Sequence, residues 1–365
     1  MGKRLLIIQR FYYNFREGFF DYLSDIKCDF KLINSTSSLG RVKVHDEAKN
    51  KSFIEKIFYF FIGENYVIFP FLFFSLIRIN PRIIVTEGGQ NTVNNFQVYL
   101  YCKIFKRKYI IWDLGKEYAN FGNSFFRKVY MNIYKLLLKH SLYIYGYNSQ
   151  SQVYFKNLGI EESKLIILNN TIDTRKIRNL RSEVDPTIPQ ELIEQSKGDY
   201  IFLIFVGSLL RSKKIESMAT LLRMLGDKYY LIIVGDGTPQ YKAELEQTFE
   251  GTNHIFVGYK KMEQLNHYYN LASFSILPGL GGLSINQSMA FGVPVICSRA
   301  DGAEKDLIIK DETGYIYTEL NDAHSYIISK SPQDWKEMGG KAESFLFTNH
   351  SVESMMNKLI YYTEI

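Results

Sequence analysis

The stretch PGLGGLSINQSMAFGVPVI, residues 278–296, is the most informative part of the sequence. An apolar run at 274–277 leads into it, and a second apolar run at 293–297 ends it. Between the two runs lie three glycines and a short helix predicted at about 284–291. This order of strand, glycine-rich loop, helix and strand leaves unpaired backbone N–H groups at a helix N-terminus, where a phosphate or a sugar hydroxyl can bind. For such a loop on its own, a plain connection between strand and helix is the alternative.

A second stretch upstream strengthens the case for a ligand site. The apolar run IFLIFV at 201–206 is followed by GSLLRSKK. Arg211, Lys213 and Lys214 therefore stand before the next predicted helix, at the carboxyl edge of a parallel sheet. Ligands of open α/β folds bind at that edge, so the two stretches together indicate a binding site there.

Short apolar runs alternate with helical patterns along the chain, which predicts an α/β fold with two doubly wound parallel sheets. The length of 365 residues corresponds to about two domains, and the polar segment 174–198 is the natural linker. We predict domains at 1–175 and 176–345, followed by a C-terminal helix within 346–365 that packs back on the first domain. The apolar runs are 5–8, 30–33, 83–85, 109–112, 142–145, 165–168, 201–206, 231–234, 255–257, 274–277 and 293–297.

Composition and charge exclude several classes of protein. Cys28, Cys102 and Cys297 are far apart and lack nearby histidines, which favours buried thiols over a disulfide framework or a zinc site. The N-terminal sequence MGKRLLIIQRF lacks the apolar core of a signal peptide, so we expect a cytoplasmic protein, soluble or peripheral. Residues 1–180 hold 27 Lys and Arg against 14 Asp and Glu, whereas residues 181–365 hold 17 against 24. We expect the basic half to meet an anionic membrane surface rather than nucleic acid, because no nucleic-acid-binding motif accompanies the charge.

Several short motifs in the second half occur in the order of one enzyme family. The first two motifs comprise Phe205, Val206, Gly207, Leu209 and Lys213, then Pro278, Gly282, Met289, Ala290, Gly292, Pro294, Val295 and Ile296. Further motifs are NTID at 170–173, IIVGDG at 232–237, FVG at 256–258, DGAE at 301–304 and ETG at 312–314. Together they resemble the retaining glycosyltransferase family numbered four, whose members read F-V-G-R-L-x-x-x-K-G and later P-S-x-x-E-x-F-G-x-x-x-x-E-A-M-A-x-G-x-P-V-I. The resemblance is strong over 165–317 and thin before it.

The resemblance implies a GT-B fold, in which two Rossmann-like domains face each other across a cleft. It also implies transfer of a sugar, with retention, from a nucleotide-diphosphate donor, UDP rather than GDP. The implied acceptor is a lipid-linked glycan of capsule, O-antigen or exopolysaccharide assembly, on the inner face of the cytoplasmic membrane. The two motif glutamates of the family fall here on Gly279 and Gln287, and an arginine falls on Ser208. Gln287 can still accept a hydrogen bond through its amide oxygen, whereas Gly279 offers only backbone.

Negative charge that grows on a leaving diphosphate must be neutralised. Lys213, with Arg211 as helper, is the predicted electrophile, together with the backbone N–H groups at 281–284. The resemblance implies a front-face mechanism in which the leaving phosphate oxygen takes the acceptor proton. The chain has no D-x-D triplet and no histidines at ligand spacing, so neither a metal nor another cofactor is predicted. The predicted donor-binding residues are Gly207, Ser208, Tyr259, Gly281, Gly282, Leu283, Ser284, Gln287 and Glu304.

Three of these donor-side residues have a structural role as the alternative. Tyr259 lies where the family contacts the base, and the alternative is packing in the core. Glu304 lies where the family keeps a carboxylate near the nucleotide, and the alternative is capping of the following helix. Gln287 has the alternative of a plain amide on a helix face.

Polar residues at strand ends of the first half are predicted to serve the acceptor. The loop QRFYYNFREGFF at 9–20 resembles the Y-R-x-x-F-F loop of some polysaccharide-assembling members. Arg16 and Gly18 would then face the interdomain cleft, with a solvated loop arginine as the alternative. Glu87 and Asp113 end successive strands at the same sheet edge. Asp113 is predicted to bind an acceptor hydroxyl, with a turn-forming aspartate as the alternative.

Two segments of the first half are candidates for contact with a membrane. Residues 52–79 are rich in aromatic side chains, but their longest uncharged run, 65–77, is too short to span a bilayer. A buried helix pair is favoured for this segment, and partial insertion into the membrane interface is the functional alternative. Residues 125–140 form a predicted basic amphipathic helix, for which a solvated helix face is the alternative.

Two other classes of function compete with sugar transfer. A dinucleotide oxidoreductase is disfavoured because no G-x-G-x-x-G follows any predicted strand. A catalytically impaired protein that binds a nucleotide sugar or a glycan is the other alternative, since both motif glutamates are missing.

Overall fold

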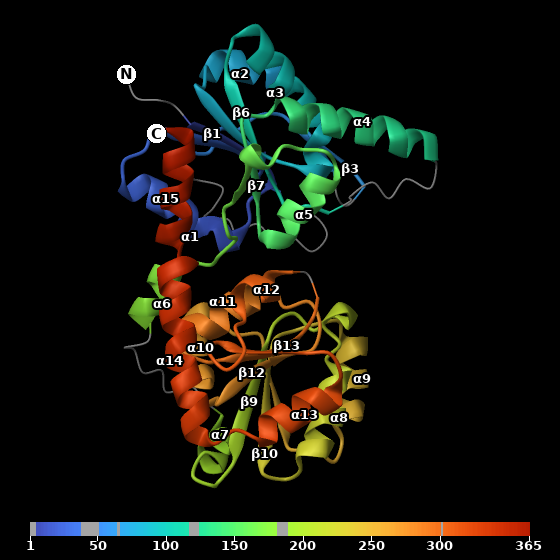
Figure 1. Cartoon of the computed structure of the whole chain (residues 1–365), viewed down its shortest axis with the longest axis vertical. Helices are drawn as coiled ribbons and strands as arrows, with labels where there is room; N and C mark the ends of the chain where they lie inside the picture. The colour runs from blue at the N-terminus through green and yellow to red at the C-terminus, as the bar shows by residue number, and fades with distance from the viewer. Residues whose placement is uncertain (1–4, 38–50, 64–65, 117–123, 181–188, 301) are drawn as a thin grey trace. The chain divides into compact units, whose positions relative to one another are not determined.

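The computed structural model describes residues 5–37, 51–63, 66–116, 124–180, 189–300 and 302–365. The chain divides into two compact units. The N-terminal unit comprises Met1–Asn170 and Glu353–Ile365, and the C-terminal unit comprises Thr171–Val352. Each unit holds a six-stranded parallel sheet with helices around it, which confirms the predicted α/β class with two doubly wound sheets (Figure 1).

The sheet of the N-terminal unit has the strand order β2-β1-β5-β6-β7-β8. The buried sides of α2, α3 and α4 pack against one face of this sheet, and α1 packs against the other through Phe19 and Trp112, whose ring centroids are 5.5 Å apart. The strands of this sheet are β1 (Leu5–Phe11), β2 (Phe30–Ser35), β5 (Ile83–Glu87), β6 (Lys108–Asp113), β7 (Ile144–Gly146) and β8 (Leu165–Ile167). The helices of the unit are α1 (Glu17–Asp25), α2 (Leu72–Ile79), α3 (Thr92–Ile104), α4 (Ser124–His140), α5 (Ser149–Asn157) and most of α15 (Val352–Thr363).

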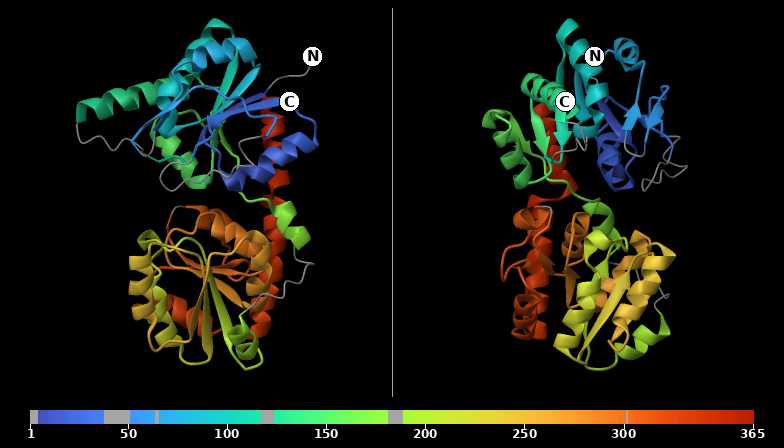
Figure 2. Two further views of the ribbon diagram at one scale, coloured as in Figure 1. Left: turned by 180° about the vertical axis from the view of Figure 1, so that it is seen from behind. Right: turned by 90° about the vertical axis from the view of Figure 1, so that its right-hand side faces the viewer.

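The sheet of the C-terminal unit has the strand order β11-β10-β9-β12-β13-β14, which is the Rossmann order. Figure 2 shows its helices on both faces. The strands are β9 (Ile201–Val206), β10 (Tyr229–Val234), β11 (His254–Gly258), β12 (Phe274–Leu277), β13 (Val295–Ser298) and β14 (Gly314–Tyr317). The helices are α6 (Thr174–Leu180), α7 (Gln190–Gln195), α8 (Glu216–Leu225), α9 (Pro239–Phe249), α10 (Met262–Leu271), α11 (Leu283–Ala290), α12 (Ala303–Leu307), α13 (Leu320–Ile328) and α14 (Pro332–Asn349).

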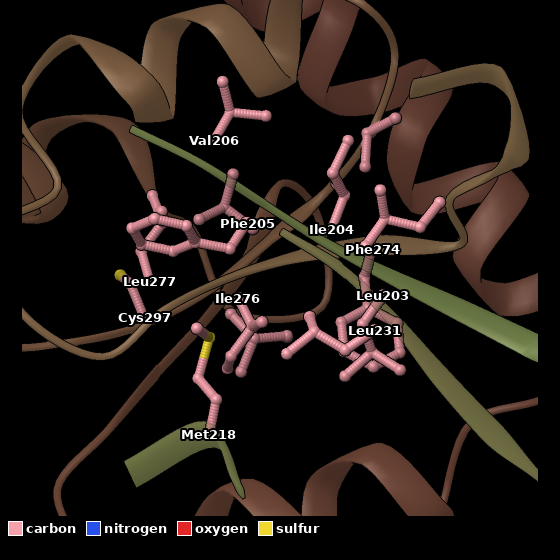
Figure 3. Packing of buried hydrophobic residues seen from close by; sticks show 14 of the residues in the cluster. Leu203, Ile204, Phe205, Val206, Met218, Leu231, Phe274, Ile276, Leu277 and Cys297 are labelled. Carbon is pink, nitrogen blue, oxygen red and sulfur yellow. The ribbon is translucent and has the colours of Figure 1, made fainter. Parts of the chain in front are cut away.

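The core of the C-terminal unit explains why its strands are almost wholly apolar. Both faces of β9 and β12 are covered, so Phe205, Ile276 and Leu277 are all buried among neighbouring apolar side chains (Figure 3). Burial of a side chain of this size contributes about 1.5–3 kcal/mol. The continuous apolar runs of the sequence are therefore those of a sheet covered on both faces.

The segment 52–79 corrects the sequence-based prediction. The described residues of this segment, 52–63 and 66–79, do not form a pair of buried helices. Instead β3 (Phe60–Ile62) and β4 (Tyr66–Ile68) form an antiparallel hairpin, and α2 is the helix in this segment. The alternating pattern of the hairpin was obscured because nearly every residue there is apolar or aromatic. A second difference is β14, which extends the sheet beyond β13 in a stretch where the sequence predicted no strand.

Candidate active site

The candidate donor site lies where the strand order of the C-terminal unit reverses. β9 and β12 are neighbours in the sheet, and the chain leaves them towards opposite edges. In open α/β sheets such a point forms a crevice outside the carboxyl ends of the strands. The loops that follow β9 and β12 are the two stretches that the sequence singled out, and the structure brings them together.

Gly279 fits directly against the loop that follows β9. The Leu280 N–H donates to the Ser212 carbonyl oxygen at 3.2 Å. A Cβ atom added at Gly279 would lie 2.6 Å from the Lys213 carbonyl carbon and even closer to the Ser212 oxygen. Any side chain there requires one of the two loops to move, because both contacts are backbone. With the loops in these positions, residue 279 must therefore be a glycine.

Lys213 lies at the glycine-rich loop. It ends the short 3₁₀ helix η5 (Arg211–Lys213), and its Nζ donates to the carbonyl oxygens of Leu280 and, at 3.5 Å, of Gly281. Its positive charge therefore stands next to the first turn of α11. Arg211 lies elsewhere: its side chain is 68% exposed and pairs with Glu244 and Glu216. The structure brings Lys213 to the loop but not Arg211.

The N-terminus of α11 is open to a ligand. Its N-cap is Gly282, at φ 54° and ψ −137°, a conformation that favours glycine. Within the described residues the N–H groups of Gly282 and Leu283 donate to no acceptor, whereas the Ser284 N–H donates to Gly281 at 3.2 Å. Unpaired N–H groups and the helix dipole favour an anion at this end. The backbone of 281–284 and the Lys213 ammonium therefore make one positive surface.

The end of β9 borders this surface. A Cβ atom at Gly207 would lie 3.7 Å from the Ser284 hydroxyl oxygen, so the two residues are adjacent. Ser208 is exposed. A pocket of about 340 Å³ opens after β10, and its lining residues are Asp236, Gly237, Pro239, Lys242, Ala243 and Glu246.

The other predicted donor-binding residues, Tyr259, Gln287 and Glu304, differ from one another in burial and in contacts. Tyr259 is 70% exposed, which excludes core packing. The Gln287 amide nitrogen lies 3.2 Å from the Met262 sulfur. Glu304 is buried, and its carboxylate accepts the N–H groups of Ala300 and Gly302, both at 2.9 Å. Glu304 thus fixes the loop before α12, a structural role close to the capping alternative.

On the N-terminal unit, Arg16 is not a solvated arginine. It is 3% exposed, its guanidinium lies 3.9 Å from the ring centroid of Trp112, and it donates to the Tyr147 hydroxyl. Gly18 is also buried, in the first turn of α1. The alternative of a solvated loop arginine is therefore wrong, because the charge of Arg16 is held against an aromatic ring inside this unit.

Glu87 lies at the topological switch of the N-terminal sheet, between β1 and β5. It accepts the Arg10 backbone N–H at 2.9 Å and pairs with the Arg10 guanidinium at 2.6 Å. Burial alone would raise the pKa of the Glu87 carboxyl, but Arg10 holds that pKa below its usual range. Sequence reasoning missed Arg10. The signal was a charged residue two positions after the apolar run 5–8, just as Glu87 stands two positions after the run 83–85 on the paired strand.

Asp113 is buried at the end of β6. Its carboxylate accepts the Gly115 N–H at 2.8 Å and the Tyr134 hydroxyl at 2.7 Å. A Cβ atom at Gly88 would lie 2.7 Å from the Cβ of Asp113, so the glycine makes room for the aspartate. Burial raises the pKa of the Asp113 carboxyl to about 6, against the lowering effect of these two hydrogen bonds. The hydrogen bond from the Gly115 N–H to Asp113 is that of the turn-forming aspartate given above as the alternative.

The described residues lack both a metal-binding cluster and a membrane-spanning helix. No group of three or more His, Cys, Asp or Glu side chains in the described ranges is placed to hold a metal ion. No helix in the part of the chain that the structure describes is long and apolar enough to cross a membrane.

Comparison with known proteins agrees with this geometry. Residues 189–329, which lie within the C-terminal unit, match the family described as Glycosyl transferases group 1. No curated protein matches the sequence.

Solved structures resemble the whole chain at low sequence identity. They include Alr3699/HepE of Anabaena in complex with UDP, with 15% identity, a TM-score of 0.75 and coverage of 99% of both chains. A glycosyltransferase of Rickettsia africae has 15% identity and a TM-score of 0.74, over 100% of this chain and 98% of that one. The lipopolysaccharide outer core galactosyltransferase WaaB has 14% identity, a TM-score of 0.67 and coverage of 99% of both chains. These likenesses confirm the GT-B fold expected from the sequence.

Proposed function

We propose that the protein is a retaining glycosyltransferase that takes a sugar from a UDP-sugar. The observation that carries the proposal is the meeting of Lys213 with the glycine-rich loop and the open N-terminus of α11 at the topological switch. This surface suits the diphosphate of a nucleotide sugar, which is anionic and compact. The HepE structures, which contain UDP or UDP-glucose, support a uridine nucleotide.

In the proposed mechanism, positive charge replaces a metal ion. As the bond between the anomeric carbon and the diphosphate oxygen breaks, negative charge grows on the β-phosphate. Lys213 and the N–H groups of Gly282 and Leu283 stabilise this charge, as an oxyanion hole does. The released phosphate oxygen takes the proton of the acceptor hydroxyl, which bonds to the anomeric carbon on the same face. No side chain is required as general base.

For the acceptor we propose a lipid-linked glycan of surface polysaccharide assembly, at the inner face of the cytoplasmic membrane. The name of WaaB places that relative in lipopolysaccharide outer core synthesis, which supports a polysaccharide acceptor here. The excess of basic residues in 1–180 supports work at an anionic surface.

A protein that binds a nucleotide sugar without transferring it is the second candidate. It is favoured by one observation, the close packing of Gly279 against Ser212, which leaves no room for the motif carboxylate. Such a protein would retain the anion surface and lack turnover.

Thermal-shift measurements with UDP, GDP, NAD and their sugar conjugates test the proposal. We expect UDP and UDP-sugars to raise the melting temperature, because a ligand at 100 times its Kd adds about 2.7 kcal/mol of stability. A shift with NAD and none with UDP would contradict it. Release of UDP from a UDP-sugar then separates the enzyme from the binding protein.

A further inference from the structure

The three helices that cover one face of the N-terminal sheet expose large apolar side chains on their outer sides. Their inner sides are fully engaged, because α2, α3 and α4 supply buried residues to the core beneath them. α3 contacts α2 on one side and α4 on the other, so the three helices form one continuous layer (Figure 1). The exposed apolar residues of these helices are Phe74, Ile77, Val93, Phe96, Leu100, Ile104, Phe125, Phe126, Val129 and Leu136.

The β3–β4 hairpin region continues this layer. Phe58, Phe60 and Ile62 are exposed, and the Phe58 ring centroid lies 6.2 Å from that of Phe71, the residue that precedes α2. Phe74, on the next turn, is 67% exposed. Apolar side chains of this size are scattered singly on ordinary soluble surfaces, and a contiguous group of them marks an interaction surface.

The three helices carry charge of one sign, although Arg78 on α2 pairs with Glu55, which precedes the hairpin. The sequences of α2, α3 and α4 contain no aspartate or glutamate. Glu87 and Asp113, which lie on the strands beneath, are turned inward and buried or nearly so. The cations on the three helices are Arg78, Lys103, Arg127, Lys128, Lys135 and Lys139.

A basic pocket borders the layer. It has a volume of about 240 Å³ and lies where the chain returns from the C-terminal ends of α2 and α3 to the sheet. Arg82, Lys106, Arg107 and Lys108 line it, against a single carboxylate from Glu364. The C-terminal ends of the helices offset part of this positive charge, because each helix end carries about half a negative charge. The balance still favours an anionic group at the edge of the apolar layer.

We propose that this layer docks in the interface of an anionic lipid bilayer, with phospholipid phosphates at its basic rim. Aromatic and aliphatic side chains enter the boundary between headgroups and acyl chains, while lysines and arginines meet the phosphates. A second copy of this chain is a poorer occupant, because it would bring the same cations face to face. The inference does not rest on sugar transfer, since docking needs no nucleotide sugar.

Sedimentation with vesicles tests this inference. The probes are vesicles of phosphatidylcholine alone and of phosphatidylcholine with 30% phosphatidylglycerol, at about 0.05 and 0.5 M NaCl. We expect the protein to bind the anionic vesicles at low salt and to be released at high salt, where the Debye length falls to a few Å. Absence of binding to anionic vesicles at low salt would overturn the proposal.

Charge variants locate the surface. The combined substitution Lys103→Gln, Lys128→Gln and Lys135→Gln should lower the partition coefficient about 100-fold, because each lysine contributes about fivefold. The matched control is Lys228→Gln, Lys336→Gln and Lys341→Gln, three exposed lysines of the C-terminal unit. The control should bind as the wild type does. An equal loss in the two triple variants would contradict docking through the layer.

Apolar variants separate insertion from simple charge attraction. Phe74→Asn with Ile104→Asn should weaken binding to anionic vesicles at least tenfold, whereas Ile328→Asn, at a 55% exposed site of the C-terminal unit, should not. Unchanged melting temperatures show that the variants fold. If the wild type is instead a dimer in solution and Phe74→Asn makes it a monomer that still binds vesicles fully, a second copy covers the layer and the proposal fails.

Discussion

The candidate site of the C-terminal unit is formed mainly by backbone groups, whereas that of the N-terminal unit is formed mainly by side chains. In the C-terminal unit the backbone of Gly279 packs against Ser212. The backbone N–H groups of Gly282 and Leu283 have no acceptor among the described residues and can bind a ligand. In the N-terminal unit the carboxyl ends of the strands are filled by side chains, among them Glu87 and Asp113, that are buried and already hydrogen-bonded. The first arrangement leaves backbone N–H groups free for a ligand, whereas in the second Glu87 and Asp113 are already engaged by neighbouring groups.

This difference determines which of the two sites a short sequence motif can reveal. A site made from backbone needs glycines at fixed positions, because a Cβ atom would block the approach of two loops. Such a requirement is visible in a sequence. A network of side chains on neighbouring strands can be assembled from many combinations of residues, so it leaves no motif.

Lys213→Ala should have the largest effect, because it removes the positive charge that Lys213 holds at the glycine-rich loop. We expect kcat to fall by about two to three orders of magnitude, the scale of one lost oxyanion donor. The control is Lys214→Ala, an exposed neighbour that should remain near wild type. Equal activities of Lys213→Ala and the wild type would show that the site does not depend on this charge.

Asp113→Asn tests the side-chain network at the carboxyl ends of the strands in the N-terminal unit. The folded state binds the Asp113 proton more tightly than the unfolded chain does, since the pKa rises from 3.8 to about 6. This group therefore makes the protein less stable as pH rises from about 4 to 6. Relative to the wild type, the variant should gain about 3 kcal/mol across that range, measured by urea unfolding.

Asp311→Asn is the control of opposite sign. Hydrogen bonds from Lys330 at 2.7 Å and Tyr326 at 2.9 Å lower the pKa of Asp311. Its contribution to stability is present above its unfolded pKa and is lost as pH falls through the folded pKa. Relative to the wild type, this variant should therefore lose stability as pH rises. The same trend in both variants would refute the assigned environments.

Gly279→Ala tests the close packing of the glycine-rich loop against the loop that follows β9. The added methyl group forces the loops apart, so we expect a loss of about 1–3 kcal/mol of unfolding free energy and weaker binding of UDP. Gly340→Ala is the matched control, because a Cβ atom there meets nothing within 4 Å. Gly340 lies inside α14, where alanine should stabilise by up to about 1 kcal/mol. Normal stability and UDP binding of Gly279→Ala would show that the loops are not tightly packed.

EDTA should have the smallest effect, since Lys213 and backbone N–H groups are proposed to neutralise the diphosphate. We expect UDP release to continue at nearly the full rate after chelation. Complete loss, restored by Mg²⁺ or Mn²⁺, would transfer the neutralising role to a metal ion.

The sequence predicted the donor side better than the acceptor side for physical reasons. The strands at 201–206 and 274–277 were placed without error because each is a run of almost entirely apolar residues bounded by a loop. The burial of Arg16 against Trp112 was missed because it depends on a contact across about a hundred residues of sequence. The β3–β4 hairpin was missed because aromatic residues occupy both of its faces, which removes the alternating pattern of a strand.

Release of UDP by the wild-type protein is the measurement that tests the central claim most directly. The protein is incubated with UDP-glucose, UDP-galactose and UDP-N-acetylglucosamine, each with and without a bacterial glycolipid extract, and free UDP is measured with time. We expect at least one donor to yield UDP faster than its spontaneous hydrolysis does, and we expect the extract to increase the rate. Tight binding of UDP with no release from any donor, with or without extract, would contradict it and leave a nucleotide-sugar binding protein.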